Sequence, residues 1–202
     1  MLLRLEDYDL LTNPGNCIES FTATGYLLEE FAVSKLEMYT AGHDGISDIK
    51  ILRMKDTATA SASYDCYAIY KNIFIMINMK AEKVGSYNNA VAAINMLHSD
   101  YVSTEPEREK AFLVFKINYD YCASERDQKK RIRIKKFDGY FLEEIDFSNG
   151  HKQDKRNWAS EFNPNSGRLL VSRKWKTSHM LPENEISYNR TKQFIDIIYN
   201  GE

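Results

Sequence analysis

Three polar residues in a hydrophobic stretch have the types and spacing of a metal-dependent hydrolytic site. Asp65 precedes Lys80 by fifteen positions, and Asn78 lies two positions before Lys80. The segments 66–70 and 73–80 predict two strands joined by a two-residue turn. Because side chains alternate along a strand, Asn78 and Lys80 would share one face, and the hairpin would bring Asp65 beside them. Phosphodiester hydrolysis requires oxygen ligands for a divalent ion and a cation near the phosphate.

The segments Tyr64-Asp65 and Asn78-Met79-Lys80 resemble the motif of the PD-(D/E)xK nuclease superfamily, in particular the type II restriction endonucleases. The resemblance covers about the first 120 residues. It implies that Asp65, Asn78 and Lys80 are catalytic and that Asp65 and Asn78 hold Mg²⁺. The core of that family runs helix, three strands, helix, strand. The fold expected from the resemblance is a restriction-endonuclease-like α/β core with a central mixed sheet flanked by helices.

Two positions depart from the family pattern. Tyr64 replaces a proline, and Asn78 stands where Asp or Glu is usual. An Asn keeps a carbonyl oxygen for the metal but removes a negative charge, so that Asn78→Asp would be expected to raise metal affinity. Asn78 is either a natural variant, as in some restriction enzymes, or a deliberate replacement of Asp that inactivates the protein. Family helices preceding the hairpin often lend a Glu to the site, which here is Glu30 with Glu29 as the alternative; Asp48 is a less favoured substitute.

The elements around the motif follow the order of the family core. Apolar positions over 25–40 predict a helix, and 46–54 predicts the first strand. Downstream, Ser86 is a candidate N-cap for a helix over 88–98, and 111–119 has the pattern of a buried strand. A last helix is expected over 187–199, packed on the rest of the domain.

Length and composition indicate one compact domain over 1–202, with the catalytic core at about 20–120 and a recognition and C-terminal part at about 121–202. The chain has 202 residues, 43% of them hydrophobic, and no linker-like segment divides it. No signal peptide or membrane span is expected, and three cysteines without metal-ligand spacing fit a reducing compartment. We therefore expect a cytoplasmic protein.

Positive charge is concentrated in the second half of the chain. Tyr121 to Lys176 holds 14 Lys and Arg against 8 Asp and Glu, although the whole chain has a net charge of −2. Basic and apolar residues alternate over 129–136. On a strand this pattern would place Arg131, Arg133 and Lys135 on one face, with Ile132 and Ile134 anchoring the other. A merely solvated sheet edge explains the same pattern equally well.

A polar segment that follows predicts a DNA-reading loop, because Arg and Lys pair with guanine and Asn and Gln with adenine in the major groove. The alternative is a solvated loop. The segment Asn163 to Val171 also resembles one in blunt-cutting enzymes of the EcoRV/HincII type. The candidate base-contacting residues are Asn149, His151, Lys152, Gln153, Lys155, Arg156 and Asn157.

These features predict a sequence-specific, Mg²⁺-dependent endonuclease of double-stranded DNA. The resemblance to type II restriction enzymes implies a homodimer that cuts palindromes, with a cognate DNA methyltransferase as its functional counterpart. Two alternatives remain open. One is a repair or junction-resolving nuclease of the same superfamily, and the other is a non-catalytic or inactivated DNA-binding protein on the same scaffold.

Overall fold

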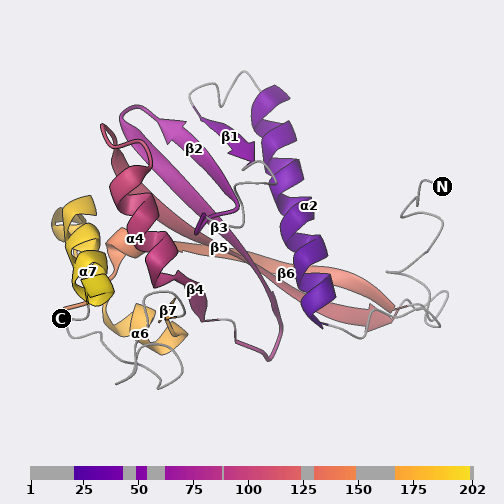
Figure 1. The fold of residues 1–202 in the computed structure, drawn as a ribbon. Coiled ribbons are helices and arrows are strands. Elements are labelled where there is room, and N and C mark those ends of the chain that lie inside the picture. The colour runs from indigo at the N-terminus through magenta and orange to yellow at the C-terminus, as the bar shows by residue number, and fades with distance from the viewer. Residues whose placement is uncertain are drawn as a thin grey trace.

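The computed structural model describes residues 21–42, 49–53, 62–87, 89–123, 130–148 and 167–200. Its centre is a five-stranded sheet of order β1-β2-β3-β5-β6 (Figure 1). β3 and β5 are parallel, and the other neighbouring strands are antiparallel. The predicted α/β class with a mixed central sheet is therefore confirmed. The strands are β1 (Lys50–Arg53), β2 (Cys66–Tyr70), β3 (Ile73–Lys83), β5 (Glu109–Ala123) and β6 (Lys130–Phe141).

A tight turn joins β2 to β3, as the sequence predicts. Lys71 takes the left-handed conformation there, with φ of 54°. In the register of the hairpin Cys66 lies opposite Ile77, and the Asp65 N–H donates to the Ile77 carbonyl at 2.9 Å. Because of this pairing, Asp65, the residue before β2, lies next to the part of β3 that contains Asn78.

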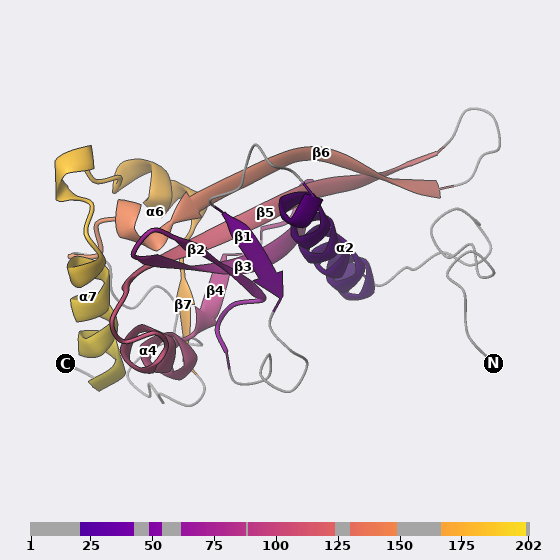
Figure 2. The same cartoon turned by 90° about the horizontal axis from the view of Figure 1, so that it is seen from above.

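Helices cover both faces of the sheet, with α2 (Phe21–Gly42) on one side and α4 (Ile94–Ser103) with α7 (Tyr188–Asn200) on the other (Figures 1 and 2). Alternate residues of β3 serve the two cores. Met79 packs with Val33 of α2, whereas Met76 packs in the cluster that contains Leu97 of α4. Burial on both faces explains the continuous apolar run of this strand.

The crossover from β3 to β5 differs from the predicted helix over 88–98. Ala90–Ala93 form a short strand, β4, which pairs with β7 (Arg168–Leu170), and the helix begins only at Ile94. Ser86 is therefore not a helix cap; its hydroxyl donates to the Lys83 carbonyl at 2.7 Å. The strand is stabilised by a partner far along the chain, which local propensity does not reveal.

The strands β5 and β6 continue past the end of β3 as a two-stranded ribbon (Figure 2). A bulge interrupts their pairing, since Asn118 lies opposite Lys136 but Tyr119 lies opposite Ile134. The extra residue at Lys135 breaks the strict alternation expected over 129–136. Ile134 is consequently 39% exposed and does not anchor the buried face as predicted.

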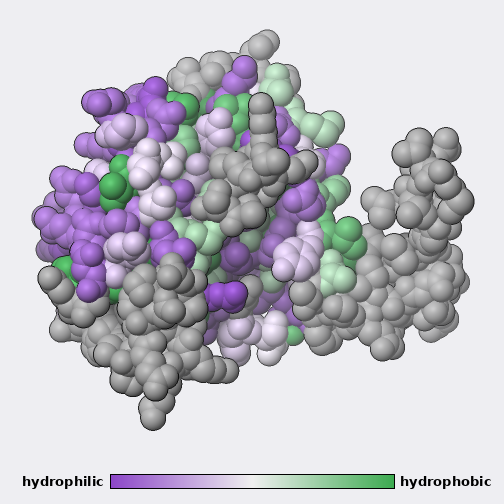
Figure 3. Space-filling model, viewed as in Figure 1, coloured by the Kyte–Doolittle hydropathy of each residue, from purple (hydrophilic) through white to green (hydrophobic). Residues whose placement is uncertain are grey.

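The C-terminal part packs against α4. The predicted last helix is present as α7, whose Ile195 is fully buried and whose Phe194 ring stacks on Phe147 at 4.3 Å between centroids. The short helix α6 (Arg173–Ser178) and the 3₁₀ turns η3 (Leu142–Glu144) and η4 (Glu183–Glu185) complete this side. The surface over α4 and α7 is mostly hydrophilic (Figure 3). None of the described helices has the length and hydrophobicity required to cross a bilayer.

Candidate active site

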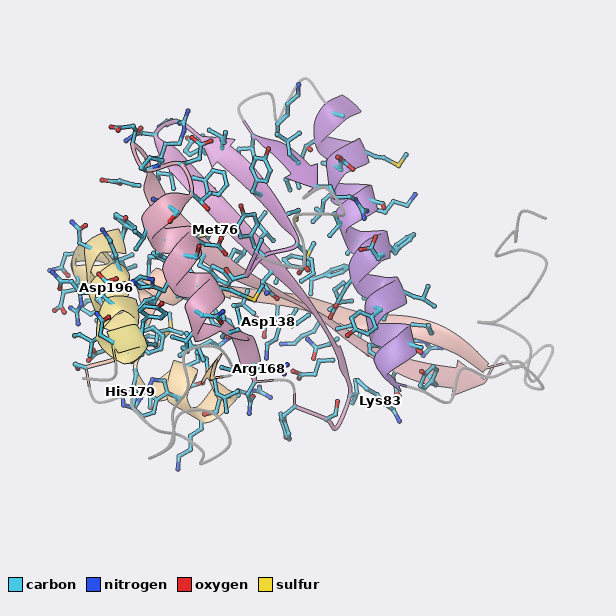
Figure 4. The ribbon with its side chains drawn as sticks, viewed as in Figure 1. Met76, Lys83, Asp138, Arg168, His179 and Asp196 are labelled. Carbon is cyan, nitrogen blue, oxygen red and sulfur yellow. The ribbon has the colours of Figure 1, made fainter. Side chains whose placement is uncertain are left out.

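A pocket of about 760 Å³ opens where β3 leaves the core between α2 and β4. Asp65, Asn78 and Lys80, the three residues singled out by their spacing, all line it, together with Glu29 of α2. Lys83 and Arg168, labelled in Figure 4, add basic side chains from β3 and β7. The predicted convergence of the hairpin residues is therefore present in the structure.

Asp65 is held by the backbone of the neighbouring strand. Its Oδ2 accepts a hydrogen bond from the Met79 N–H at 2.6 Å. Burial raises the pKa of this carboxyl, while the Met79 hydrogen bond and the positive charge of Lys80 offset part of the rise. A buried carboxylate in a pocket is the kind of group that a bound cation would stabilise.

Asn78 is 5% exposed and has a fixed amide orientation. Its Nδ2 donates to the Ser63 carbonyl at 2.6 Å and to the Val91 carbonyl at 3.3 Å. Both partners can only accept, so the nitrogen must face them. The other amide atom, Oδ1, is buried and has no hydrogen-bond partner within the described ranges. A buried acceptor without a donor is costly, and a cation would satisfy it.

Lys80 lies two positions beyond Asn78 on the same strand face and lines the same pocket. Its charge lowers the pKa of both Asp65 and Glu29 relative to the effect of burial alone. It has no hydrogen-bond or ion-pair partner among the described side chains, so its ammonium group is available to a bound anion.

The helix carboxylate at this site is Glu29. Its Oε1 accepts from the Ala81 N–H at 2.8 Å, and burial raises its pKa against the opposing effects of this bond and of Lys80. Glu30, the residue expected from the resemblance, instead forms an ion pair with Arg53 of β1 and has a side chain that is 69% exposed. Glu29 lines the pocket and Glu30 does not, which agrees with the turn of about 100° between successive helix residues.

The oxygen atoms available to a metal are therefore two carboxylates, Asp65 and Glu29, and the Asn78 amide. No group of three or more His, Cys, Asp and Glu side chains is arranged for a metal in the part of the chain described. Asn78 itself is a neutral amide and is not one of these four residue types. Hard oxygen donors of this kind fit Mg²⁺, and the unpartnered Oδ1 is the observation that favours one.

Of the predicted DNA-contacting residues, Arg133 and Lys135 have described side chains and the others do not. Arg133 and Lys135 are exposed on β6. Arg131 lies in β6 opposite Cys122, and its side chain is not among those described. The whole candidate reading loop lies outside the described residues, namely Asn149, His151, Lys152, Gln153, Lys155, Arg156 and Asn157. Asp48, the substitute carboxylate, lies outside them too.

Sequence reasoning did not find a second hollow, of about 610 Å³, beside α6. Arg173 and Lys174 line it with the exposed ring of Tyr87, and no acidic residue is among its described lining residues. The sequence signal for this hollow is the short basic run Arg173-Lys-Trp-Lys176. Its three basic residues are part of the excess of Lys and Arg over 121–176 and do not stand out within it.

A comparison with known proteins found no family model that matches the chain and no curated protein with significant similarity.

Proposed function

We propose that the protein is a Mg²⁺-dependent endonuclease of double-stranded DNA, with a restriction-endonuclease-like core. The observation that carries this proposal is the convergence of Asp65, Glu29, Asn78 and Lys80 in one pocket, where the buried Asn78 Oδ1 has no hydrogen-bond partner among the described residues. The element order supports it, since it runs helix, three strands, helix, strand apart from the short strand β4 inserted before the second helix, as does the parallel pairing of β3 with β5.

In this proposal Asp65, Glu29 and Asn78 would hold the cation. Bound there, Mg²⁺ would polarise the scissile phosphate and favour deprotonation of water. Lys80 would stabilise the negative charge that develops on the phosphate oxygens as water attacks phosphorus and the P–O bond to the leaving oxygen breaks. Arg168 and Lys83, which line the pocket, would attract the DNA backbone, and so would the exposed basic side chains of β6.

The type II restriction class adds sequence specificity, a homodimer and a methyltransferase counterpart to this proposal. A digest of a plasmid of known sequence, with Mg²⁺ and mapping of the ends, tests it. We expect ends at one short palindromic sequence, no cleavage in EDTA, and none by Asp65→Ala. Scattered ends or cleavage only at junctions would favour a repair nuclease.

The non-catalytic alternative rests on Asn78, which lowers the negative charge available to a metal. A protein of that kind would bind DNA without cutting it at any Mg²⁺ or Mn²⁺ concentration. The same digest therefore separates the two functions, with a binding titration on the same DNA as the second readout.

A further inference from the structure

The side-chain amide of Asn78 joins three segments of the chain. It extends from β3, and its Nδ2 donates to Ser63, two residues before Asp65, and to Val91 of β4. All three residues are buried, with Ser63 3% and Val91 2% exposed. The amide thus fixes the loop that carries Asp65 against the strand that carries Lys80.

The Ser63 peptide is held from its other side as well. Its N–H donates at 2.6 Å to Oδ2 of Asp100, a buried residue of α4. Side chains therefore satisfy both the carbonyl and the N–H of Ser63, which lies two residues before Asp65. Such a doubly held backbone segment limits the positions that Asp65 can take.

An ionised Asp at position 78 could not make these contacts. The carboxylate has the same shape as the amide but donates no hydrogen bond when ionised. It would place an oxygen against the Ser63 and Val91 carbonyl oxygens at the distances now bridged by N–H groups. Both carbonyls would lose their donor in a buried setting, and the new charge would be repelled by them.

We propose that Asn78 is the residue this fold requires at the motif position, and not a degraded Asp: its nitrogen clamps the Asp65 loop, and the clamp leaves its oxygen as the amide atom that a metal would take. The clamp stands on the hydrogen bonds alone, whereas the ligand role of Oδ1 rests on the proposed function. The site then offers two carboxylates and a neutral oxygen, and an exchange of Asn78 for Asp would add a negative charge only by breaking the clamp.

The clamp is tested by urea unfolding in EDTA and without DNA. Asn78→Asp should lower the equilibrium constant for folding at pH 8 by at least about tenfold, since two buried carbonyls lose their donors. The matched control is Asn72→Asp, which adds the same charge at the exposed turn of the same hairpin and should change the constant by less than about threefold. An Asn78→Asp protein as stable as the parent, or more stable, would overturn the clamp.

A measurement on the parent keeps the test decisive if Asn78→Asp does not fold. In metal-free protein the two Nδ2 hydrogens of Asn78 should exchange with solvent at least about 100 times more slowly than those of the exposed Asn72, because they are buried and hydrogen-bonded. Exchange as fast as that of Asn72 would show that the clamp is absent.

The ligand role has its own readout, the rise in the unfolding midpoint with Mg²⁺. The rise should be smaller in Asn78→Ala than in the parent, and an equal rise would remove Oδ1 from the ligand set. No rise in the parent would count against a Mg²⁺ site, and with it the proposed function, while the metal-free results on the clamp would stand.

Discussion

Two adjacent glutamates of α2 have opposite surroundings, which makes them a matched pair for a test. Glu29 lies against the β3 backbone in the pocket, and Glu30 is exposed in an ion pair with Arg53. We expect Glu29→Gln to slow DNA cleavage at low Mg²⁺ by about 10- to 100-fold through loss of ligand charge, and Glu30→Gln to change it by less than about twofold. Cleavage rates over a Mg²⁺ titration measure this. A larger loss of cleavage in Glu30→Gln than in Glu29→Gln would show that Glu30 is the helix carboxylate that acts at the site.

The sequence alone could not predict whether Glu29 or Glu30 faces the pocket. Both are acidic neighbours on a helix with apolar residues on several sides, and the pattern does not fix which side faces β3. The spacing of Asp65, Asn78 and Lys80 was more informative, because a two-residue turn leaves one register for the hairpin. What the spacing did not reveal is the bond from Asn78 to Ser63, which depends on the path of the loop before β2.

A buried carboxyl outside the pocket gives a pH prediction. Glu143 accepts hydrogen bonds from the Tyr101 hydroxyl at 2.6 Å and from the Phe112 N–H at 3.0 Å. Burial raises its pKa to about 7 from an ordinary value of 4.5, although both hydrogen bonds oppose the rise. The folded protein therefore holds this proton more tightly than the unfolded chain does. The stability that the proton contributes is complete below pH 4.5 and is lost as the pH rises through 7.

Glu143→Gln removes this titration and can keep both contacts, with the Tyr101 hydroxyl accepting instead of donating. Relative to the variant, we expect the parent to lose on the order of 3 kcal/mol of unfolding free energy between about pH 4.5 and pH 8. Urea unfolding of both proteins across this range measures the difference. A constant difference would show that Glu143 titrates normally.

Local sequence patterns were sufficient to predict α2, the β2–β3 hairpin, β5 and α7. They failed where pairing partners are distant in the sequence. Residues 90–93 form a strand because β7 lies beside them, and the bulge at Lys135 arises from the register between β5 and β6. Neither pairing leaves a local signal in hydrophobic periodicity.

The edge strand β6 is a candidate surface for contact with the DNA backbone. Arg133 and Lys135 are exposed there, and Arg133→Ala with Lys135→Ala should weaken binding to cognate and random duplexes alike. The slope of log affinity against log salt should fall in magnitude by about 0.9 for each phosphate that the variant no longer neutralises. Lys50→Ala on β1, at the opposite edge of the sheet, is the control. Weaker binding to the cognate duplex alone would identify β6 as a base-reading element.

A restriction enzyme that cuts both strands of a palindrome requires two-fold symmetry. We expect analytical ultracentrifugation of the purified protein to give the mass of two chains. Asp65→Ala should leave that mass unchanged, because Asp65 lies in the pocket and bonds within its own chain. A monomer that cuts duplex DNA would instead favour a nuclease that acts on one strand at a time.

The proposed function requires that the pocket around Lys80 cleaves phosphodiester bonds, and single-turnover cleavage of duplex DNA by the parent and by Lys80→Ala measures this. With DNA binding matched in EDTA and folding matched by urea unfolding, we predict that Lys80→Ala cleaves at least about 100 times more slowly, because it removes charge stabilisation in the transition state. Lys50→Ala should cleave at the parent rate. Equal rates for parent and Lys80→Ala, or no Mg²⁺-dependent cleavage by the parent, would contradict the claim.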